Sequence, residues 1–191
     1  RLWIADLALL LVAVVWGINV PVMKSALQIG INPYALNAIR LVVSMLVLQL
    51  AAAIEFRAGV RPDRSIRWSR ILVYAMIVSV GYQILFLLAV SKTSSADVAL
   101  IMATVPMWTA LMARVFLSER LKPLSWLGLF IALAGTIIVA GGKAAQANSP
   151  DELPHRLVGN SIALIAALTW AGGTVFSRPV LKMISPTQLA A

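Results

Sequence analysis

The sequence predicts an all-α membrane protein, a polytopic bundle of transmembrane helices. Of its 191 residues, 61% are hydrophobic and only 12% are charged, and the mean hydropathy of +0.91 is well above that of a soluble domain. The apolar residues form unbroken runs, without the apolar and polar alternation of barrel strands. Several runs approach the roughly 20 residues that a helix needs to cross a bilayer. We therefore expect six transmembrane helices, with a seventh beginning near Pro186.

The expected helices follow one another along the chain with short polar connections. The first five cover residues 2–28, 34–54, 71–91, 97–117 and 124–142, an exterior linker covers 143–156, and the sixth covers 157–180. Residues 1–142 then form one repeat, and residues 157–191 begin a second. Because the chain starts with Arg1 and stops just as a helix begins, we expect the sequence to be part of a longer protein.

The basic residues predict how the bundle is oriented. Of the sixteen Lys and Arg residues, most fall in connections on one side of the expected bundle, namely Arg1, Arg57, Arg61, Arg64, Arg67, Arg70, Arg114, Arg120, Lys122, Arg178 and Lys182. Short loops rich in Lys and Arg remain in the cytoplasm, so the N-terminus is expected inside. The net charge of +9 is thus a signal of topology. No recognition motif accompanies it, and binding to nucleic acid is not expected.

The first two helices carry charge within the membrane. Pro21 and Lys24 share one stripe of the first helix, and Arg40 lies about 10 Å into the second, at 1.5 Å per residue. Intramembrane charges are candidates for function, but long basic side chains also extend to the headgroups. Pro21 is likewise either a hinge beside a polar path or an ordinary packed kink. These alternatives remain open.

Polar and aromatic residues on the helices are candidates for the wall of a solute path. Tyr82 and Gln83 share a face that suits an organic solute, although helix packing explains it nearly as well. Pro106 predicts a bend in the fourth helix, and Gly128 and Gly135 predict close helix contact. The path candidates are Trp16, Asn19, Lys24, Asn37, Arg40, Tyr82, Gln83, Thr104, Trp108, Trp170 and Thr174, and the hinge and packing candidates are Pro21, Pro106, Gly128 and Gly135.

The start of the first repeat returns near the end of the chain. When Trp16 is aligned with Trp170, Lys24 stands opposite Arg178. Five helices separate the two starts, so the corresponding helices cross in opposite directions. Lys24 is then expected at the outer end of its helix and Arg178 at the inner end. This pattern indicates an inverted-topology repeat, which gives many secondary transporters two exchangeable states around a central site.

These stretches also carry a family resemblance. The segments WGINVPVMKSAL, NAIR and LAVSKTSSADVALIMATVPMWTALMARVFLSERLKPLSWLGLFIALAGTIIVAGG resemble the first half of an EamA-type member of the drug/metabolite transporter superfamily. The segment GNSIALIAALTWAGGTVFSRPVLKMISP is similar to the opening of that family's second half. The resemblance implies ten helices in two inverted halves of five, cytoplasmic termini and a bacterial inner membrane location. It also implies export of metabolites, amino acids or drugs through a central cavity. Against this pattern, the chain lacks most of the second half, helices seven to ten.

We therefore expect a secondary transporter that exports a small metabolite, such as an amino acid, by alternating access. Lys24 and Arg40 are expected to favour solutes that carry a carboxylate or phosphate. The alternative is a non-transporting membrane subunit, or an inactive part of such a transporter. No enzyme, cofactor or metal site is expected. The expected partners are the lipid bilayer, a small-molecule solute and the missing C-terminal repeat, with a homo-oligomer left open.

Overall fold

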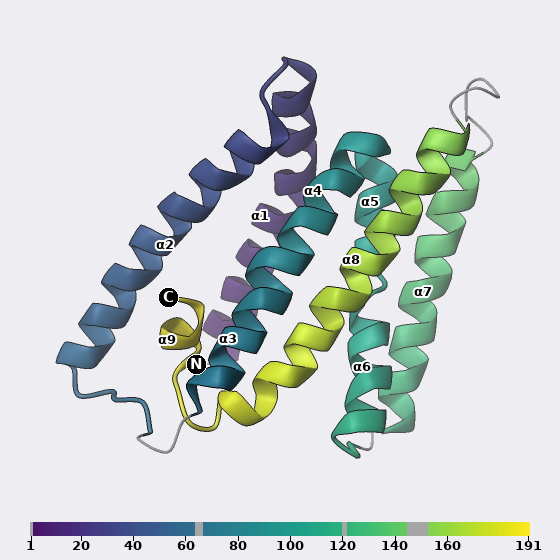
Figure 1. Ribbon diagram of the computed structural model, residues 1–191. Coiled ribbons are helices and arrows are strands. Elements are labelled where there is room, and N and C mark those ends of the chain that lie inside the picture. Colours follow the sequence, from purple (N-terminus) through teal and green to yellow (C-terminus); the bar gives the residue numbers. More distant parts are fainter. Residues whose placement is uncertain (1, 64–66, 120–121, 145–152) are drawn as a thin grey trace.

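The computed structural model describes residues 2–63, 67–119, 122–144 and 153–191 and is a bundle of helices (Figure 1). No strand occurs in these ranges, so the predicted all-α class is confirmed. The elements are α1 (Leu2–Gln28), α2 (Pro33–Arg57), α3 (Trp68–Ala75), the π-helix η1 (Met76–Tyr82), α4 (Gln83–Lys92), α5 (Ser95–Met102), α6 (Val105–Phe116), α7 (Pro123–Ala144), α8 (Leu153–Val180) and α9 (Pro186–Ala190).

Five stretches are long and apolar enough to cross a membrane by length and composition, namely Leu10–Gln28, Tyr34–Arg57, Trp68–Lys92, Ser95–Phe116 and Pro154–Val180. The apolar part found in α7, Pro123–Gly135, is shorter. Most of the linker expected at 143–156 lies outside the described residues. Its first residues belong to α7, and its last residues already belong to α8.

The helix expected at 71–91 is longer, and it is not a uniform α-helix. It runs from Trp68 to Lys92 and contains η1 in its middle. A π-helix widens the backbone locally and is frequent at functional sites. Val78 of η1 packs closely against Gly173 of α8. A Cβ added at Gly173 would lie only 2.5 Å from a Val78 methyl. This contact between distant segments is not visible in the local sequence pattern.

The span expected at 97–117 corresponds to the apolar stretch Ser95–Phe116, in which the chain forms two helices. α5 ends at Met102 and α6 begins at Val105. Pro106 is in the first turn of α6, where a proline is tolerated because the donor it lacks has no intrahelical partner. The interruption therefore comes at Ala103 and Thr104, just before the proline, and not as a bend around it.

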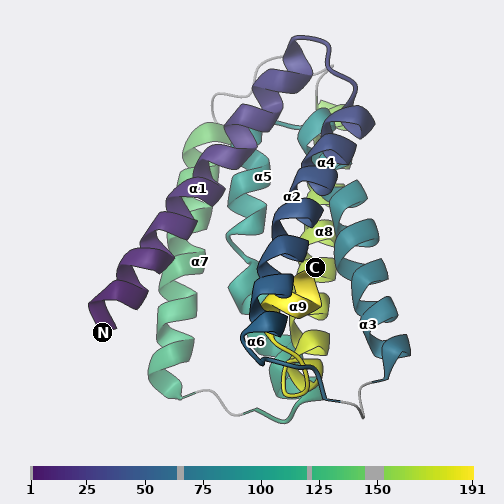
Figure 2. The ribbon, with the colours of Figure 1, turned by 90° about the vertical axis from the view of Figure 1, so that its left-hand side faces the viewer.

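α8 is the central element of the bundle. It packs against α4, α5, α6 and η1, and it runs in the opposite direction to α1 (Figures 1 and 2). Its packed face consists of small residues, and Ala163, Ala166, Ala167 and Ala171 have no exposed surface. Small residues let helix backbones approach closely, as is typical of helices in membranes.

The glycines that make close helix contacts are not the two that the sequence suggested. A Cβ added at Gly128 or Gly135 would meet no atom within 4 Å, because α7 lies at the edge of the bundle (Figure 1). A Cβ at Gly159 would instead lie 2.6 Å from the Thr93 Cβ and 2.9 Å from backbone atoms of Lys92 and Thr93. Gly159 and Gly173 on α8 are therefore the close-approach positions.

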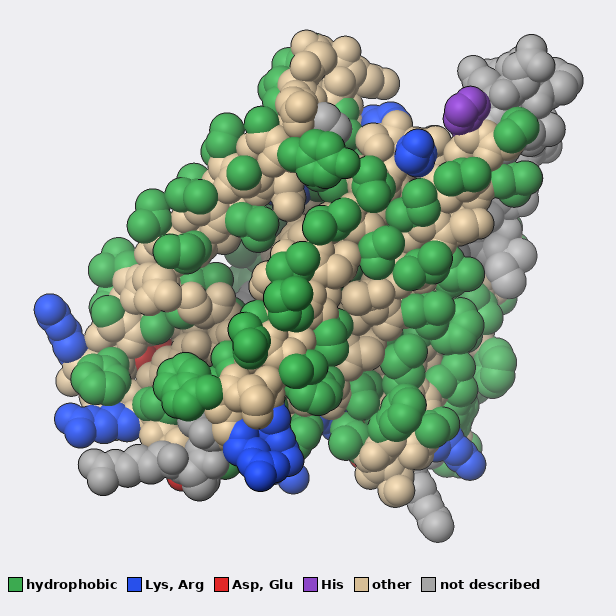
Figure 3. Space-filling view, viewed as in Figure 1, with side chains coloured by type: hydrophobic (Ala, Val, Ile, Leu, Met, Phe, Trp, Pro, Cys, Tyr) green, Lys and Arg blue, Asp and Glu red, His purple; other side chains and the backbone are tan. Residues whose placement is uncertain are grey.

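The charged side chains divide between the two ends of the bundle. Lys and Arg gather along the lower edge in Figure 3. At this edge α2 ends and α3 begins, α6 ends and α7 begins, and α8 ends. The opposite end holds the C-terminus of α4 and the start of α8, with Lys92 and Arg156. The middle of the bundle is largely apolar on the face shown. This distribution is what a membrane-spanning bundle requires.

Candidate functional site

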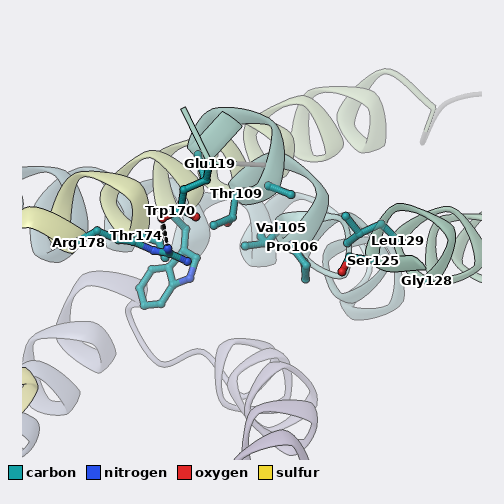
Figure 4. Close-up of a pocket in the computed structure, with 12 residues that line it drawn as sticks. Val105, Pro106, Thr109, Glu119, Ser125, Gly128, Leu129, Trp170, Thr174 and Arg178 are labelled. Atoms are coloured by element: carbon teal, nitrogen blue, oxygen red, sulfur yellow. Dashed lines mark hydrogen bonds and ion pairs between the residues drawn. The ribbon is translucent and has the colours of Figure 1, made fainter. Parts of the chain in front are cut away.

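A cavity of about 550 Å³ lies between α6, α7 and α8 (Figure 4). Its volume falls in the range of pockets that hold small organic molecules. Its lining combines apolar, hydroxyl and charged groups from Val105, Pro106, Thr109, Ala110, Ala113, Glu119, Ser125, Gly128, Leu129, Trp170, Thr174 and Arg178. Two of the predicted path residues, Trp170 and Thr174, therefore reach it, as do Pro106 and Gly128.

Trp170 links this cavity to an aromatic cluster between four helical segments. Its ring packs edge-on to Trp16 of α1, with 5.8 Å between centroids, and lies 4.6 Å from the Tyr82 ring at the end of η1. Tyr82 in turn stacks on Phe86 at 5.5 Å. Trp16 and Trp170 are the two positions that match in the repeated start. Their ring contact joins α1 to α8, and of the two rings Trp170 lines the cavity.

One end of the cavity carries an ion pair between Arg178 of α8 and Glu119, which follows α6 (Figure 4). Glu119 is directed there by its neighbour Ser118, which has a φ of 55°, in the left-handed region that few non-glycine residues adopt. The Glu119 amide also donates to the carbonyl of Ala113 at 3.3 Å. This bond closes the C-terminus of α6 and turns the carboxylate toward α8.

The start of α6 supplies a polar part of the cavity wall. Pro106, in the first turn of α6, lines the cavity. Thr109 follows one turn later, and Ser125 faces it from α7 across the cavity (Figure 4). Hydroxyl groups both donate and accept hydrogen bonds, so the wall can bind either kind of polar group on a solute.

Lys24 binds backbone carbonyls and does not line this cavity. Its Nζ donates to the carbonyl oxygens of Val90 and Thr93, both at 2.8 Å. These carbonyls lie at the C-terminus of α4, where the helix dipole favours a cation. The sequence left two alternatives for Lys24, a role in a cavity or extension of its side chain to the headgroups. In the structure its cation closes a helix end and fastens α1 to α4.

The other predicted path residues lie outside the cavity lining. Arg40 points to α1, with its Nη1 3.7 Å from the Met23 sulfur. Trp108 donates its indole hydrogen to the Thr104 hydroxyl at 3.1 Å, so these two stabilise the start of α6. Asn19, Asn37 and Gln83 are half-buried, as are Arg40, Thr104 and Trp108. The structure thus brings together Trp16, Tyr82, Trp170 and Thr174, and it separates them from Lys24.

At the end of the bundle away from Glu119 lies a second polar group, here called the Asp97 cluster. Arg156 contacts the Asp97 carboxylate twice, at 2.6 Å through Nε and 3.0 Å through Nη2. The Thr93 hydroxyl lies 3.1 Å from the same carboxylate and 2.7 Å from the Asn160 side-chain oxygen. Ser94 caps α5 by accepting from the Asp97 amide at 3.0 Å. The cluster joins α5 and α8 to the end of α4.

Sequence reasoning did not include four polar residues of the cavity among its path candidates: Thr109, Glu119, Ser125 and Arg178. Arg178 was marked by its alignment with Lys24, and Glu119 lies just after the end of the helix expected at 97–117. Their pairing, however, depends on how α6 ends. In the described part of the chain, no three His, Cys, Asp or Glu residues lie close enough together to hold a metal ion.

Comparison with known proteins agrees with this architecture. The chain is 29% identical to a probable terminal-alkyne amino-acid exporter of Streptantibioticus cattleyicolor, over 91% of the chain and 63% of that protein. It is 25% identical to the uncharacterized inner membrane transporter YedA of Escherichia coli, over 91% and 53%. It is 22% identical to the uncharacterized transporter YoaV of Bacillus subtilis, over 93% and 58%. The chain thus spans little more than half the length of these relatives.

A protein of known crystal structure has the same fold, with a TM-score of 0.65 and 21% identity over 91% of this chain and 60% of that protein. The model of the EamA-like transporter family matches residues 3–141. This match covers most of the chain and includes α1 to α6 and nearly all of α7. The matched helices supply most of the aromatic cluster and the Glu119 side of the cavity. Because the match extends over more than half of the chain, the chain belongs to the EamA-like transporter family, whose members are multi-pass membrane proteins.

Proposed function

We propose that the chain is the solute-binding part of a secondary transporter, which exports a small organic solute by alternating access. The observation that supports this most directly is the cavity between α6, α7 and α8, which combines the Trp170 ring with hydroxyl and charged groups. The relatives named as transporters or exporters support the same class. An amino acid or similar metabolite is the proposed cargo.

The groups at the cavity suit a zwitterion. Arg178 offers a guanidinium that can bind a carboxylate in a bidentate manner, and Glu119 offers an acceptor for an ammonium group. The two now bind each other, so a zwitterionic solute would exchange one ion pair for two. The ring of Trp170 would pack against the apolar part of the solute. The selection of anions, expected from Lys24 and Arg40, is therefore assigned to Arg178.

The proposed orientation places the Glu119 end in the cytoplasm of a bacterial cell, with the N-terminus on the same side. The connections at this end carry Arg57, Arg61, Arg67, Arg70, Arg114, Lys122, Arg178 and Lys182. Basic residues in short loops favour the cytoplasmic side. A solute would then enter the cavity from the cytoplasm, which fits export.

A second candidate is a non-transporting membrane subunit, or an inactive part of such a transporter. It is supported by the length comparison, since the chain covers 53% to 63% of the three relatives above. A C-terminal repeat, supplied by a longer chain, is the proposed partner that would complete the transport path. Self-association into a homo-oligomer is a further hypothesis.

Uptake into proteoliposomes tests the proposal. A labelled zwitterionic amino acid, its decarboxylated amine and its deaminated acid would be compared with Arg178→Gln and a matched control, Lys182→Gln. Both positions are exposed at the same end, but only Arg178 lines the cavity. Loss of a charged hydrogen bond corresponds to roughly a tenfold or greater reduction in uptake.

We expect Arg178→Gln to reduce uptake of the amino acid and the acid while uptake of the amine is retained. Lys182→Gln should behave like the parent protein. Equal effects of the two substitutions would contradict the role given to Arg178. If the parent protein moves none of the three solutes, with or without a co-reconstituted C-terminal repeat, the non-transporting alternative is favoured.

A further inference from the structure

We propose that the Asp97 cluster and the Glu119–Arg178 pair are two gates at opposite ends of α8, and that the structure represents a state closed at the Asp97 end. This inference rests on the proposed transport function and adds the residues that control access to the cavity. Both gates join α8 to the interrupted helix α5–α6. They differ in burial and in the number of contacts.

The Asp97 gate is tight. Arg156 binds both carboxylate oxygens of Asp97, and the side chains of Arg156 and Asp97 are 28% and 11% exposed. The Thr93 hydroxyl and Asn160 complete the group. Lys24 binds the Thr93 carbonyl and so ties α1 to the same point. Removing one partner of such a shielded pair is costly, because the other charge is left without compensation.

The Glu119–Arg178 gate is loose. It is a single contact, and the side chains of Arg178 and Glu119 are 52% and 39% exposed. An ion pair that is open to solvent contributes little to stability, because water and salt screen both charges. Both residues also line the cavity. A solute can therefore separate them and enter from this end while the Asp97 gate stays closed.

The spacing of the two gates lets one helix operate both. Arg156 and Arg178 lie on α8, twenty-two positions apart. At 1.5 Å per residue this is about 33 Å, close to the thickness of the hydrocarbon core. Trp170 and the cavity lie between them. A tilt of α8 about its packed middle would draw one end toward α5–α6 and move the other end away.

The partners of the two arginines stand on different pieces of the interrupted helix. Asp97 is in the first turn of α5, and Glu119 follows the end of α6. The interruption at Ala103 and Thr104 separates these pieces, as in the discontinuous helices that form the sites of many transporters. The Glu119 gate can therefore open without displacing Asp97.

The chain contains no cysteine, so single cysteines can report access to the cavity. Thr174→Cys places a thiol in the cavity wall, while Ser91→Cys and Lys122→Cys mark the exposed Asp97 and Glu119 ends. A membrane-impermeant maleimide would be applied to right-side-out and to inside-out vesicles. In the otherwise unchanged protein we expect labelling of Thr174→Cys only from the side on which Lys122→Cys reacts.

Adding Asp97→Asn should open the second route, with labelling from the Ser91 side raised about tenfold or more. The exchanged pair Asp97→Arg with Arg156→Asp should restore the closed behaviour. Thr93→Val, which removes only one hydroxyl, should raise labelling in the same direction to a smaller degree. It also serves as the test variant if Asp97→Asn fails to fold.

The proposal is overturned if Thr174→Cys already reacts from the Ser91 side, or if neither Asp97→Asn nor Thr93→Val changes labelling from that side. Uptake measured in parallel separates this result from the proposed function. Solute uptake with unchanged labelling would refute the gates and leave transport standing. The expected labelling without any uptake would support the gates and refute transport by this chain.

Discussion

The contact between Gly159 and the end of α4 gives the sharpest prediction for stability. A Cβ at position 159 would lie 2.6 Å from the Thr93 Cβ and 2.9 Å from both the Lys92 carbonyl carbon and the Thr93 nitrogen. Two of these three atoms belong to the backbone and cannot rotate away. Gly159→Ala therefore forces α8 and the end of α4 apart.

Overpacking of this kind costs about 1–3 kcal/mol. An alanine also gains about 1 kcal/mol over glycine in a helix interior, which obscures the cost in a single variant. Gly128→Ala is the matched control, because it gives the same gain in α7 and its Cβ would meet no atom within 4 Å. The difference between the two variants isolates the clash.

Thermal unfolding in detergent, followed by the loss of monodisperse protein in size-exclusion chromatography, measures this difference. At roughly 2–4 °C per kcal/mol for a chain of this length, Gly159→Ala should melt about 2–12 °C below Gly128→Ala. The maleimide labelling of Thr174→Cys should also rise from the Asp97 end, because Thr93 belongs to that cluster. Equal melting temperatures would show that α4 and α8 are not in contact at Gly159.

Three further substitutions test single contacts in the same thermal assay. Lys24→Met removes two hydrogen bonds to carbonyls at the end of α4 and should destabilise the protein by about 1–3 kcal/mol. Lys92 is exposed at the same end, so the control Lys92→Met should have little effect. Ser118→Gly should stabilise by about 1 kcal/mol, because glycine adopts the observed φ of 55° without steric cost; a lower melting temperature would contradict this. Trp16→Ala should lose the edge contact with Trp170, which is worth about 0.5–1.5 kcal/mol beyond burial. The near-ultraviolet circular dichroism of this variant should weaken. An unchanged spectrum would show that the two rings do not interact.

The Asp97 cluster and Gly159 show where prediction from sequence stops. Asp97 was visible only as the first residue of the helix expected at 97–117, and Arg156 as the last residue of the expected linker. They lie 59 positions apart, and no local pattern connects such positions. Gly128 and Gly135 formed the expected small-residue pattern, yet a Cβ added at either position would meet no atom within 4 Å. Spacing identifies positions that can pack, but it does not identify the helix that will face them.

The interrupted helices show a related limit. Pro106 correctly indicated a discontinuity in the fourth span, because a proline removes a donor wherever it stands. Whether the chain bends or divides into α5 and α6 depends on how neighbours satisfy the freed groups. In η1 no proline marks the change at all, and the packing of Val78 against Gly173 accompanies it.

The sequence by itself determined the class of the protein, the approximate positions of its apolar helices and the segregation of basic residues to one end. These properties follow from transfer of side chains between water and lipid, which acts on each residue locally. It also marked Trp16 and Trp170 as equivalent positions. Only the tertiary structure decided that these two rings meet, that Lys24 closes α4, and that Glu119 and Arg178 border a cavity, because each of these contacts joins segments that are brought together by the packing of α8.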